Sequence, residues 1–267
     1  MKSFKPGTDI IFKQNCVGLG DSLQFSTLPQ RYNESGHNFY ISKENRVANP
    51  GIQNLVWEHN PYVINCTTTE KINCTYHTHM TVELSERFNV RNMLEWAEFS
   101  HGFKIQNSIP KVYYTPNIIT DYKNYNILDI SAHTCYEKRY YEWGILKKQI
   151  SSVVSKENTL LLDNCQELLL PNNERITDEF VELGFETIPV IDIYNYADMI
   201  KSCNMFYCLY SGGASLASAL REDGAFVFFP SFIDEVKEIR SGSHLYPNNK
   251  YYKSDGKFLN DMAIWRF

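Results

Sequence analysis

The chain has 267 residues, enough for one large or two small domains, and its 43% hydrophobic and 21% charged residues are ordinary for a folded soluble protein. A formal net charge of −5 without a long basic block argues against a nucleic-acid-binding protein. No apolar run has the length of a signal peptide or a membrane span, so we expect a soluble, cytoplasmic protein. Peripheral contact with the inner face of the membrane stays open.

Short apolar runs in the first half of the chain predict strands at 9–12, 38–42 and 54–57, with helices at 22–33 and 84–99. Residues 60–82 have no clear period and predict irregular structure or short strands. The stretch 104–126 carries Pro110 and Pro116 without a helical pattern, which is typical of a linker. We therefore predict an N-terminal domain over 1–115 and a C-terminal domain over 125–267.

In the second half, strands alternate regularly with helices. The strands are expected at 126–131, 159–163, 186–191, 205–210 and 225–229, and the helices at 140–154, 173–183, 194–202, 214–221 and 233–240. This alternation indicates a parallel sheet with helices on both faces. Ligands of such sheets bind beyond the carboxyl ends of the strands.

A hydroxyl residue and two glycines follow the strand at 205–210, in the segment Ser211-Gly212-Gly213-Ala214-Ser215. Glycines let backbone N–H groups approach a ligand closely, and the N-terminus of the following helix favours an anion. The segment suits a phosphate of a ligand. It equally suits a tight turn with close packing and no ligand, and the residues alone leave both interpretations open.

Asp21 ends a second glycine turn, Gly18-Leu19-Gly20-Asp21, which follows the first strand. An aspartate at a helix start often caps the helix by accepting backbone N–H groups. It can also act as a general base that deprotonates an acceptor hydroxyl. Gly18 and Gly20 fit both interpretations.

Lys138 and Thr134 lie between the strand at 126–131 and the next helix. A cation and a hydroxyl at this edge can reach a phosphate held by the neighbouring loop, although a solvated Lys138–Arg139 pair would look the same in sequence. Seven cysteines without a Cys-x-x-Cys pair indicate reduced thiols. Cys74, His77 and His79 lack a second ligand pair, so we expect no metal.

Three ordered segments resemble the GT-B glycosyltransferases, and most closely the ADP-heptose:lipopolysaccharide heptosyltransferase family. They are Gly18-Leu19-Gly20-Asp21-Ser22-Leu23 with Thr27-Leu28-Pro29, then 131–138 with Tyr140-Tyr141-Glu142-Trp143, and finally 196–203 with Ser211-Gly212-Gly213. The resemblance implies an α/β, GT-B-like fold with two Rossmann-type parallel-sheet domains and a cleft between them. The N-terminal domain would face the acceptor, and the C-terminal domain would bind a nucleotide-sugar donor.

The resemblance also implies roles for individual residues. Asp21 would be the catalytic base, beside the acceptor-side turn of Gly18 and Gly20. The donor phosphate would be bound by Thr134, Lys138, Ser211, Gly212, Gly213, Ala214 and Ser215. The family usually has Asp and His where this chain has Tyr210 and Ser215.

The function implied is metal-independent and cofactor-free transfer of a sugar from a nucleotide diphosphate to a hydroxyl of a cell-surface glycan, of the lipopolysaccharide or capsule type. Two alternatives stay open. One is a non-catalytic relative that binds sugar nucleotides or glycans, which the Tyr210 and Ser215 departures favour. The other is a nucleotide-sugar epimerase. The sugar, the base, the acceptor and the oligomeric state are not specified by the sequence.

Overall fold

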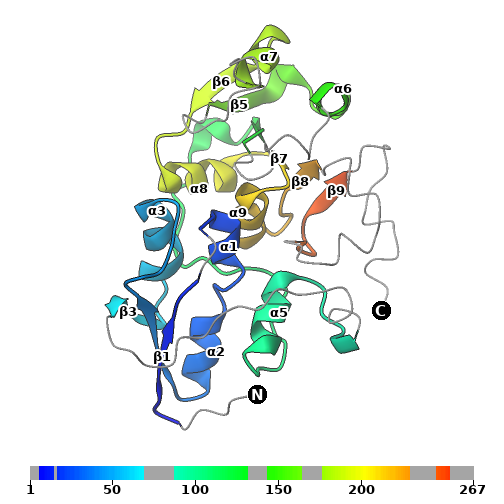
Figure 1. The fold of residues 1–267 in the computed structure, drawn as a ribbon. Helices are drawn as coiled ribbons and strands as arrows, with labels where there is room; N and C mark the ends of the chain where they lie inside the picture. Colours follow the sequence, from blue (N-terminus) through cyan, green and yellow to red (C-terminus); the bar gives the residue numbers. More distant parts are fainter. Residues whose placement is uncertain are drawn as a thin grey trace. The chain divides into compact units, whose positions relative to one another are not determined.

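The structure, a computed structural model, describes residues 6–14, 17–68, 87–131, 143–163, 176–228 and 245–252 (Figure 1). The chain divides into two compact units. The N-terminal unit comprises Met1–Thr115 with Lys237–Pro247, and the C-terminal unit comprises Pro116–Val236 with Asn248–Phe267.

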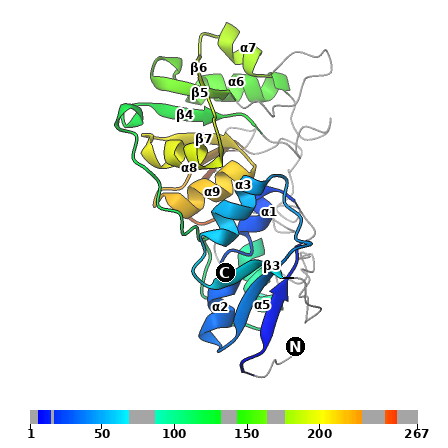
Figure 2. The ribbon, with the colours of Figure 1, turned by 90° about the vertical axis from the view of Figure 1, so that its left-hand side faces the viewer.

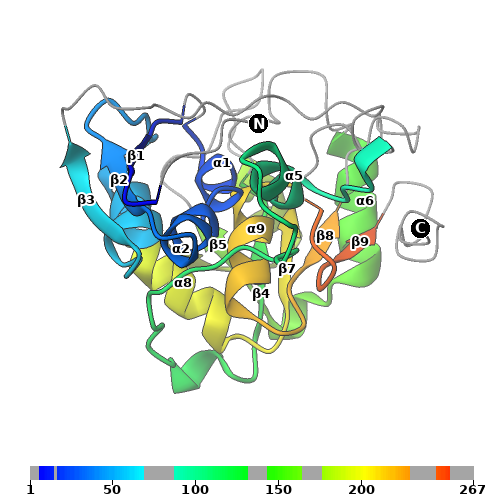
Figure 3. The same cartoon turned by 90° about the horizontal axis from the view of Figure 1, so that it is seen from below.

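The N-terminal unit contains a parallel sheet in the order β1-β2-β3, whose strands lie side by side in Figure 3. The strands span Asp9–Phe12, Asn38–Ser42 and Val63–Thr68. Ile10 pairs with Phe39 in the register of β1 and β2. The predicted strands at 9–12 and 38–42 are confirmed with the same bounds, and β3 is one of the short strands expected within 60–82.

Two predictions for the helices of this unit are wrong. The single helix expected over 22–33 is two helices, α1 (Leu19–Leu23) and α2 (Leu28–Glu34), because the chain turns between them and Pro29 starts the second one. The strand expected at 54–57 is a π-helical segment, η1 (Asn54–Glu58), which continues α3 (Pro50–Gln53). A short apolar run does not distinguish a buried helix from a strand.

Helix α5 spans Met93–Ser100, a shorter stretch than the predicted 84–99. Asn89 has a φ of 51°, a left-handed conformation that a right-handed helix does not contain. The helix therefore begins only after Asn92, whose side chain accepts a hydrogen bond from the backbone of Glu95.

Aromatic side chains form the centre of the N-terminal core. The Phe12 ring on β1 lies 5.0 Å from Phe25, 5.9 Å from Phe39 and 5.8 Å from Trp57, measured between centroids. All four side chains are buried. These contacts connect β1, β2 and η1, so the turn that follows β1 rests on a rigid core.

The C-terminal unit has a six-stranded parallel sheet in the order β6-β5-β4-β7-β8-β9, and Figure 2 shows the first four strands in that order. Its strands are β4 (Asn126–Asp129), β5 (Thr159–Asp163), β6 (Glu186–Pro189), β7 (Phe206–Leu209), β8 (Phe226–Phe228) and β9 (Lys250–Tyr252). The predicted strands at 126–131, 159–163, 186–191, 205–210 and 225–229 are all present, with small differences at their ends. Strand β9 was not predicted.

Helices cover both faces of this sheet. They are α6 (Trp143–Val153), α7 (Ile176–Glu182), α8 (Ile193–Ser202) and α9 (Gly212–Leu220), with short 3-10 turns η2 (Thr120–Tyr122) and η3 (Lys156–Asn158). The predicted helix at 233–240 lies outside the described residues. Gly184, after α7, has a φ of 92°, as its predicted position at the helix C-terminus requires.

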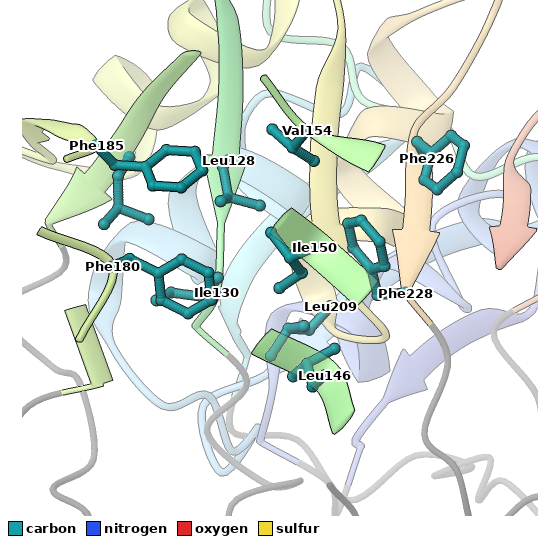
Figure 4. Close-up of a cluster of buried hydrophobic side chains, with 11 residues drawn as sticks. Leu128, Ile130, Leu146, Ile150, Val154, Phe180, Phe185, Leu209, Phe226 and Phe228 are labelled. Carbon is teal, nitrogen blue, oxygen red and sulfur yellow. The ribbon is translucent and has the colours of Figure 1, made fainter. Parts of the chain in front are cut away.

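Alternation along the central strands assigns the helices to faces. Leu128 of β4 and Leu209 of β7 belong to one buried cluster with Ile150 of α6 and Phe180 of α7 (Figure 4). On the opposite face, the Phe206 ring lies 6.2 Å from the ring of Tyr196 on α8. Helices α8 and α9 pack against each other, and α9 packs on β7. Asp129, one residue beyond Leu128, therefore points to the α8 and α9 face.

A pair of asparagines just before β9 ties the end of the sheet to α9. The Asn249 side chain donates to the carbonyl of Ala214 and accepts from the N–H of Ala225. The Asn248 side chain donates to the carbonyls of Ser218 and Arg221. The Asn248 bonds satisfy carbonyl groups at the C-terminal end of α9, and the Asn249 bond reaches its first turn. Within the described ranges, no helix is long and apolar enough to cross a membrane.

Candidate functional site

The strand order places a switch point in the middle of the C-terminal sheet. From β4 the chain builds outward through β5 and β6 on one side, and then returns to build β7, β8 and β9 on the other. Strands β4 and β7 are neighbours, with Asp129 in register with Cys208. In parallel sheets with helices on both faces, ligands bind in the crevice at the carboxyl ends of such a strand pair. The segments that start there are 129–131 and 210–213.

Asp129 is the buried acidic group at this switch point, with 2% of its surface exposed. Its Oδ1 accepts the backbone N–H of Ser131 at 2.8 Å and also the Ser131 hydroxyl. Its Oδ2 accepts the hydroxyl of Tyr196 from α8. Three donors therefore compensate the removal of the carboxylate from water.

Tyr196 supplies one of these donors from a buried position. Burial and the neighbouring Asp129 carboxylate raise the pKa of the Tyr196 phenol well above 10.0. Burial and the same carboxylate also raise the pKa of the Cys208 thiol well above 9.0. Both groups stay protonated at neutral pH, so Tyr196 acts as a donor and Cys208 carries no charge.

Gly213, in the first turn of α9, lies directly against this pair. A Cβ atom at Gly213 would overlap the Tyr196 hydroxyl and would lie 3.0 Å from Asp129 Oδ2 and 3.4 Å from Ser211 Oγ. Only glycine leaves space for the close approach of α8 and Asp129 to α9. Of the two interpretations that the sequence left open for this glycine, close packing has direct support.

Ser211 is the N-cap residue of α9. Its Oγ accepts the N–H of Gly213 at 3.2 Å, and its carbonyl accepts the N–H of Ala214 at 3.2 Å. Ser211 and Gly212 are partly exposed, whereas Gly213, Ala214 and Ser215 are buried. An anion that approaches this turn therefore meets the N–H of Gly212 first, and would have to displace the Ser211 hydroxyl to reach Gly213.

Asp21 belongs to the N-terminal unit and ends the first turn of α1. Its Oδ2 accepts the N–H of Gly18 at 3.0 Å. Gly18 is therefore the N-cap residue, and Asp21 bonds back to it from the third helical position instead of capping the helix itself. An ionised carboxylate has about four lone-pair sites, so the bond from Gly18 is compatible with a second role as a proton acceptor. Asp21 is partly exposed, and Gly20 beside it is buried.

Gln14 fixes the turn that carries Asp21. The Gln14 side-chain amide donates to Ser22 Oγ at 2.8 Å and to the Arg46 carbonyl at 2.9 Å, and its backbone N–H donates to Asn45 Oδ1 at 2.9 Å. Ser22 Oγ in turn donates to the Gly18 carbonyl at 3.2 Å. The turn is thus bonded to the loop that follows β2.

No family model and no curated protein sequence matches the chain. Solved structures do match it. TibC from enterotoxigenic E. coli, described as an iron-containing dodecameric glycosyltransferase, aligns with a TM-score of 0.60 at 12% identity over 92% of this chain and 63% of TibC. A TibC complex with ADP-D-β-D-heptose aligns at 0.54 and 14% identity, over 85% of this chain and 58% of that one.

A glycosyltransferase family 9 protein from Veillonella parvula aligns with a TM-score of 0.53 at 10% identity, over 82% of this chain and 79% of the other. The chain has the heptosyltransferase fold. The resemblance noted in the three sequence segments is confirmed at the level of fold, and so is the α/β, GT-B-like class with parallel sheets. The chain spans less than two thirds of the length of TibC.

Within the heptosyltransferase fold, the predicted site residues fall into two groups. Gly18, Gly20 and Asp21 share one turn of the N-terminal unit, and 211–215 form the start of α9 in the C-terminal unit. Thr134 and Lys138 lie outside the described residues, as do Cys74, His77 and His79. Across the described ranges, no three His, Cys, Asp or Glu side chains gather closely enough to hold a metal ion.

Sequence reasoning missed Asp129, Tyr196 and Gln14. Asp129 ends an apolar strand, where an acidic residue stands out, and that was the available signal. Tyr196 was part of a matched segment but received no role. Gln14 has no signal in the sequence, because its importance comes from contacts with Ser22 and Arg46 that only the fold creates.

Proposed function

We propose that the chain is a glycosyltransferase that moves a sugar from a nucleotide diphosphate to a hydroxyl of a cell-surface glycan, of the lipopolysaccharide or capsule type. The observation that carries the proposal is the glycine turn Ser211–Gly213 at the switch point of a sheet with the heptosyltransferase fold. The complex of TibC with ADP-D-β-D-heptose makes a nucleotide-sugar donor the ligand class to test first.

In the proposed reaction, Asp21 accepts the proton of the acceptor hydroxyl. The acceptor oxygen forms a bond to the anomeric carbon, the bond between that carbon and the donor phosphate oxygen breaks, and the nucleoside diphosphate leaves with the electron pair. The charge on the leaving group would be stabilised by Lys138, Thr134 and the N-terminus of α9. No step of this reaction requires a metal.

The test of Asp21 separates catalysis from binding. Asp21→Asn is nearly isosteric but removes the base, and we expect at least a 100-fold loss of transfer with nucleotide affinity unchanged, as is typical for general bases. Isothermal titration with ADP, UDP, GDP and CDP measures binding, and release of nucleoside diphosphate from the matching donor sugar measures transfer. Asp9→Asn, the same carboxylate-to-amide change at a partly exposed residue of the same unit, is the matched control.

Equal transfer by the wild type and by Asp21→Asn would remove the catalytic assignment. Loss of both transfer and nucleotide binding in that variant would show damage to the fold instead of loss of a base. Circular dichroism of each variant identifies the second case.

A non-catalytic sugar-nucleotide-binding protein is the second candidate. It is favoured by Tyr210 and Ser215, which stand where the heptosyltransferase family usually has Asp and His. A protein of this kind would bind one nucleoside diphosphate and transfer no sugar to any glycan acceptor. Nucleotide binding with no release of nucleoside diphosphate, over a panel of donors and acceptors, would favour it.

A further inference from the structure

Asp129 connects three segments that are far apart in the sequence. Its own strand leads into Ser131, its Oδ2 accepts Tyr196 from α8, 67 residues later, and its carboxylate lies against Gly213 of α9. Both turns of the switch point, 129–131 and 211–213, are therefore in contact with the same carboxylate. A change at this carboxylate would move both turns together.

Stability alone does not explain a buried charge at this place. Replacing buried ionic groups with well-packed apolar residues is often neutral or stabilising, so a buried carboxylate is weak support for a purely structural role. The Asp129 carboxylate does fix the local geometry, because hydrogen bonds are directional and each donor must approach it at a favourable angle. The geometry it fixes is that of the carboxyl ends of β4 and β7, where ligands of such sheets bind.

Ser215 is a second, independent observation that points to a ligand. It follows Ser211 by one turn on the same side of α9, and helix side chains lean toward the N-terminus. Its side chain is fully buried, and its hydroxyl has no hydrogen-bond partner in the part of the chain that the structure describes. Buried hydroxyls of native proteins nearly always find a partner, so a missing one indicates a group that the bound state supplies.

We propose that Tyr196 and Asp129 are positioning residues that hold the two turns of the switch point in the arrangement that receives the diphosphate of the donor. The proposal rests on the proposed function and adds two residues to it. Neither residue needs to touch the ligand. Tyr196 acts through Asp129, and Asp129 acts through the Ser131 and Gly213 backbone.

The test compares diphosphate with nucleoside. The wild type is titrated with ADP, UDP, GDP and CDP, and the tightest of these is then compared with its own nucleoside by ligand-observed NMR, along with inorganic pyrophosphate. Tyr196→Phe removes only the hydroxyl. Because hydrogen bonds to charged groups are the stronger class, we expect about tenfold weaker binding of the diphosphate and of pyrophosphate, and nucleoside affinity within about twofold.

Ser202→Ala is the matched control. Ser202 lies on the same helix α8, is equally buried, and loses a donated bond to the Asp198 carbonyl and an accepted bond from Ile119 when it is replaced. It lies at the opposite end of the helix, so it should leave both affinities within about twofold. If Tyr196→Phe does not fold, Ser131→Ala removes one donor to Asp129 and should weaken diphosphate binding selectively.

A diphosphate affinity unchanged by Tyr196→Phe would overturn the positioning role. An equal loss for nucleoside and diphosphate would overturn it too, because general damage to the unit would explain both. A wild-type protein that binds none of the four nucleotides would overturn the proposed function itself. That outcome is recognised before any variant is made.

Discussion

Replacing Gly213 with alanine puts two physical effects in opposition. Gly213 is the second residue of α9, where alanine is favoured over glycine by up to about 1 kcal/mol. Intrinsic propensity alone therefore predicts a more stable protein. The surroundings predict the opposite, because the new Cβ would overlap the Tyr196 hydroxyl and lie 3.0 Å from Asp129 Oδ2.

The contacts give the size of the destabilisation. Overpacking of a core typically costs about 1–3 kcal/mol. The side chain that must move is Tyr196, and moving it breaks its bond to the Asp129 carboxylate, a charged-group hydrogen bond of about 1.5–3 kcal/mol. The helix propensity of alanine offsets about 1 kcal/mol of this, so we expect Gly213→Ala to lower the free energy of unfolding by about 1.5–5 kcal/mol.

Urea unfolding followed by circular dichroism measures the change, and Gly144→Ala is the control. Gly144 is also in the first turn of a helix, α6, but no atom of the described residues lies within 4 Å of the position of its Cβ. That variant should be neutral or more stable by up to about 1 kcal/mol. The two alanines therefore differ in the sign of their effect, although the chemical change is identical.

A double-mutant cycle with Tyr196→Phe tests the cause. The phenylalanine lacks the hydroxyl that the Gly213→Ala methyl group would overlap, so the two destabilisations should not add. We expect the double variant to be more stable than the sum predicts, by about 1–3 kcal/mol. Simple additivity, or a Gly213→Ala variant as stable as Gly144→Ala, would refute the contact between Gly213 and the Tyr196–Asp129 pair.

Three further expectations follow. Lys138→Ala should weaken binding of the preferred nucleoside diphosphate at least tenfold, measured by calorimetry, if that lysine binds the donor phosphate. Burial raises the pKa of the Cys203 thiol from 9.0 to about 11. The free energy of unfolding should therefore be unaffected by this thiol below pH 9 and fall by up to about 3 kcal/mol as the pH rises from 9 to 11. Cys203→Ser should flatten this loss in urea melts. Arg221→Lys should lower stability by about 1–3 kcal/mol, because the guanidinium donates to three carbonyls, of Ile200, Cys203 and Asn204.

The parallel sheet of the C-terminal unit was predictable because local signals agreed with the fold. Strands β4, β5, β7 and β8 are short apolar runs, and polar or glycine-containing turns separate the strands from the helices; β6, with the sequence Glu-Thr-Ile-Pro, has the weakest signal of the five. Strand β9 carried no such signal. It is three residues long at the edge of the sheet, and only its pairing with Phe226–Phe228 makes it a strand.

The run Asn54–Trp57 shows the limit of pattern reading. Leu55, Val56 and Trp57 are all buried, so neither a period of two nor a period of 3.6 is visible. The better signal preceded the run, in Asn49-Pro50, where the asparagine side chain accepts from Ile52 and the proline occupies the first helical position. Capping residues were more informative than hydrophobicity at this point.

The candidate site was only partly predictable for a related reason. Glycine turns and an acid at a helix start can be seen in a sequence, and Asp21 and Gly213 were found in that way. The partner of Gly213 cannot be seen, because Tyr196 approaches it from another helix through a contact that depends on the whole packing of α8 and α9. The glycines of a turn indicate that another group packs closely against its backbone, but the identity of that group depends on the tertiary structure.

Asn248 and Asn249 have a consequence for how the protein can be made. The chain leaves the C-terminal unit at Val236 and returns to it only at Asn248, so the carbonyls of Ala214, Ser218 and Arg221 obtain their donors from the last part of the sequence. A contiguous fragment that ends at 236 would lose these side-chain donors and would leave the edge of β8 unpaired. During synthesis on a ribosome, α9 and β8 leave the exit tunnel before the residues that secure them, so the edge of β8 stays unpaired until Lys250–Tyr252 has been made.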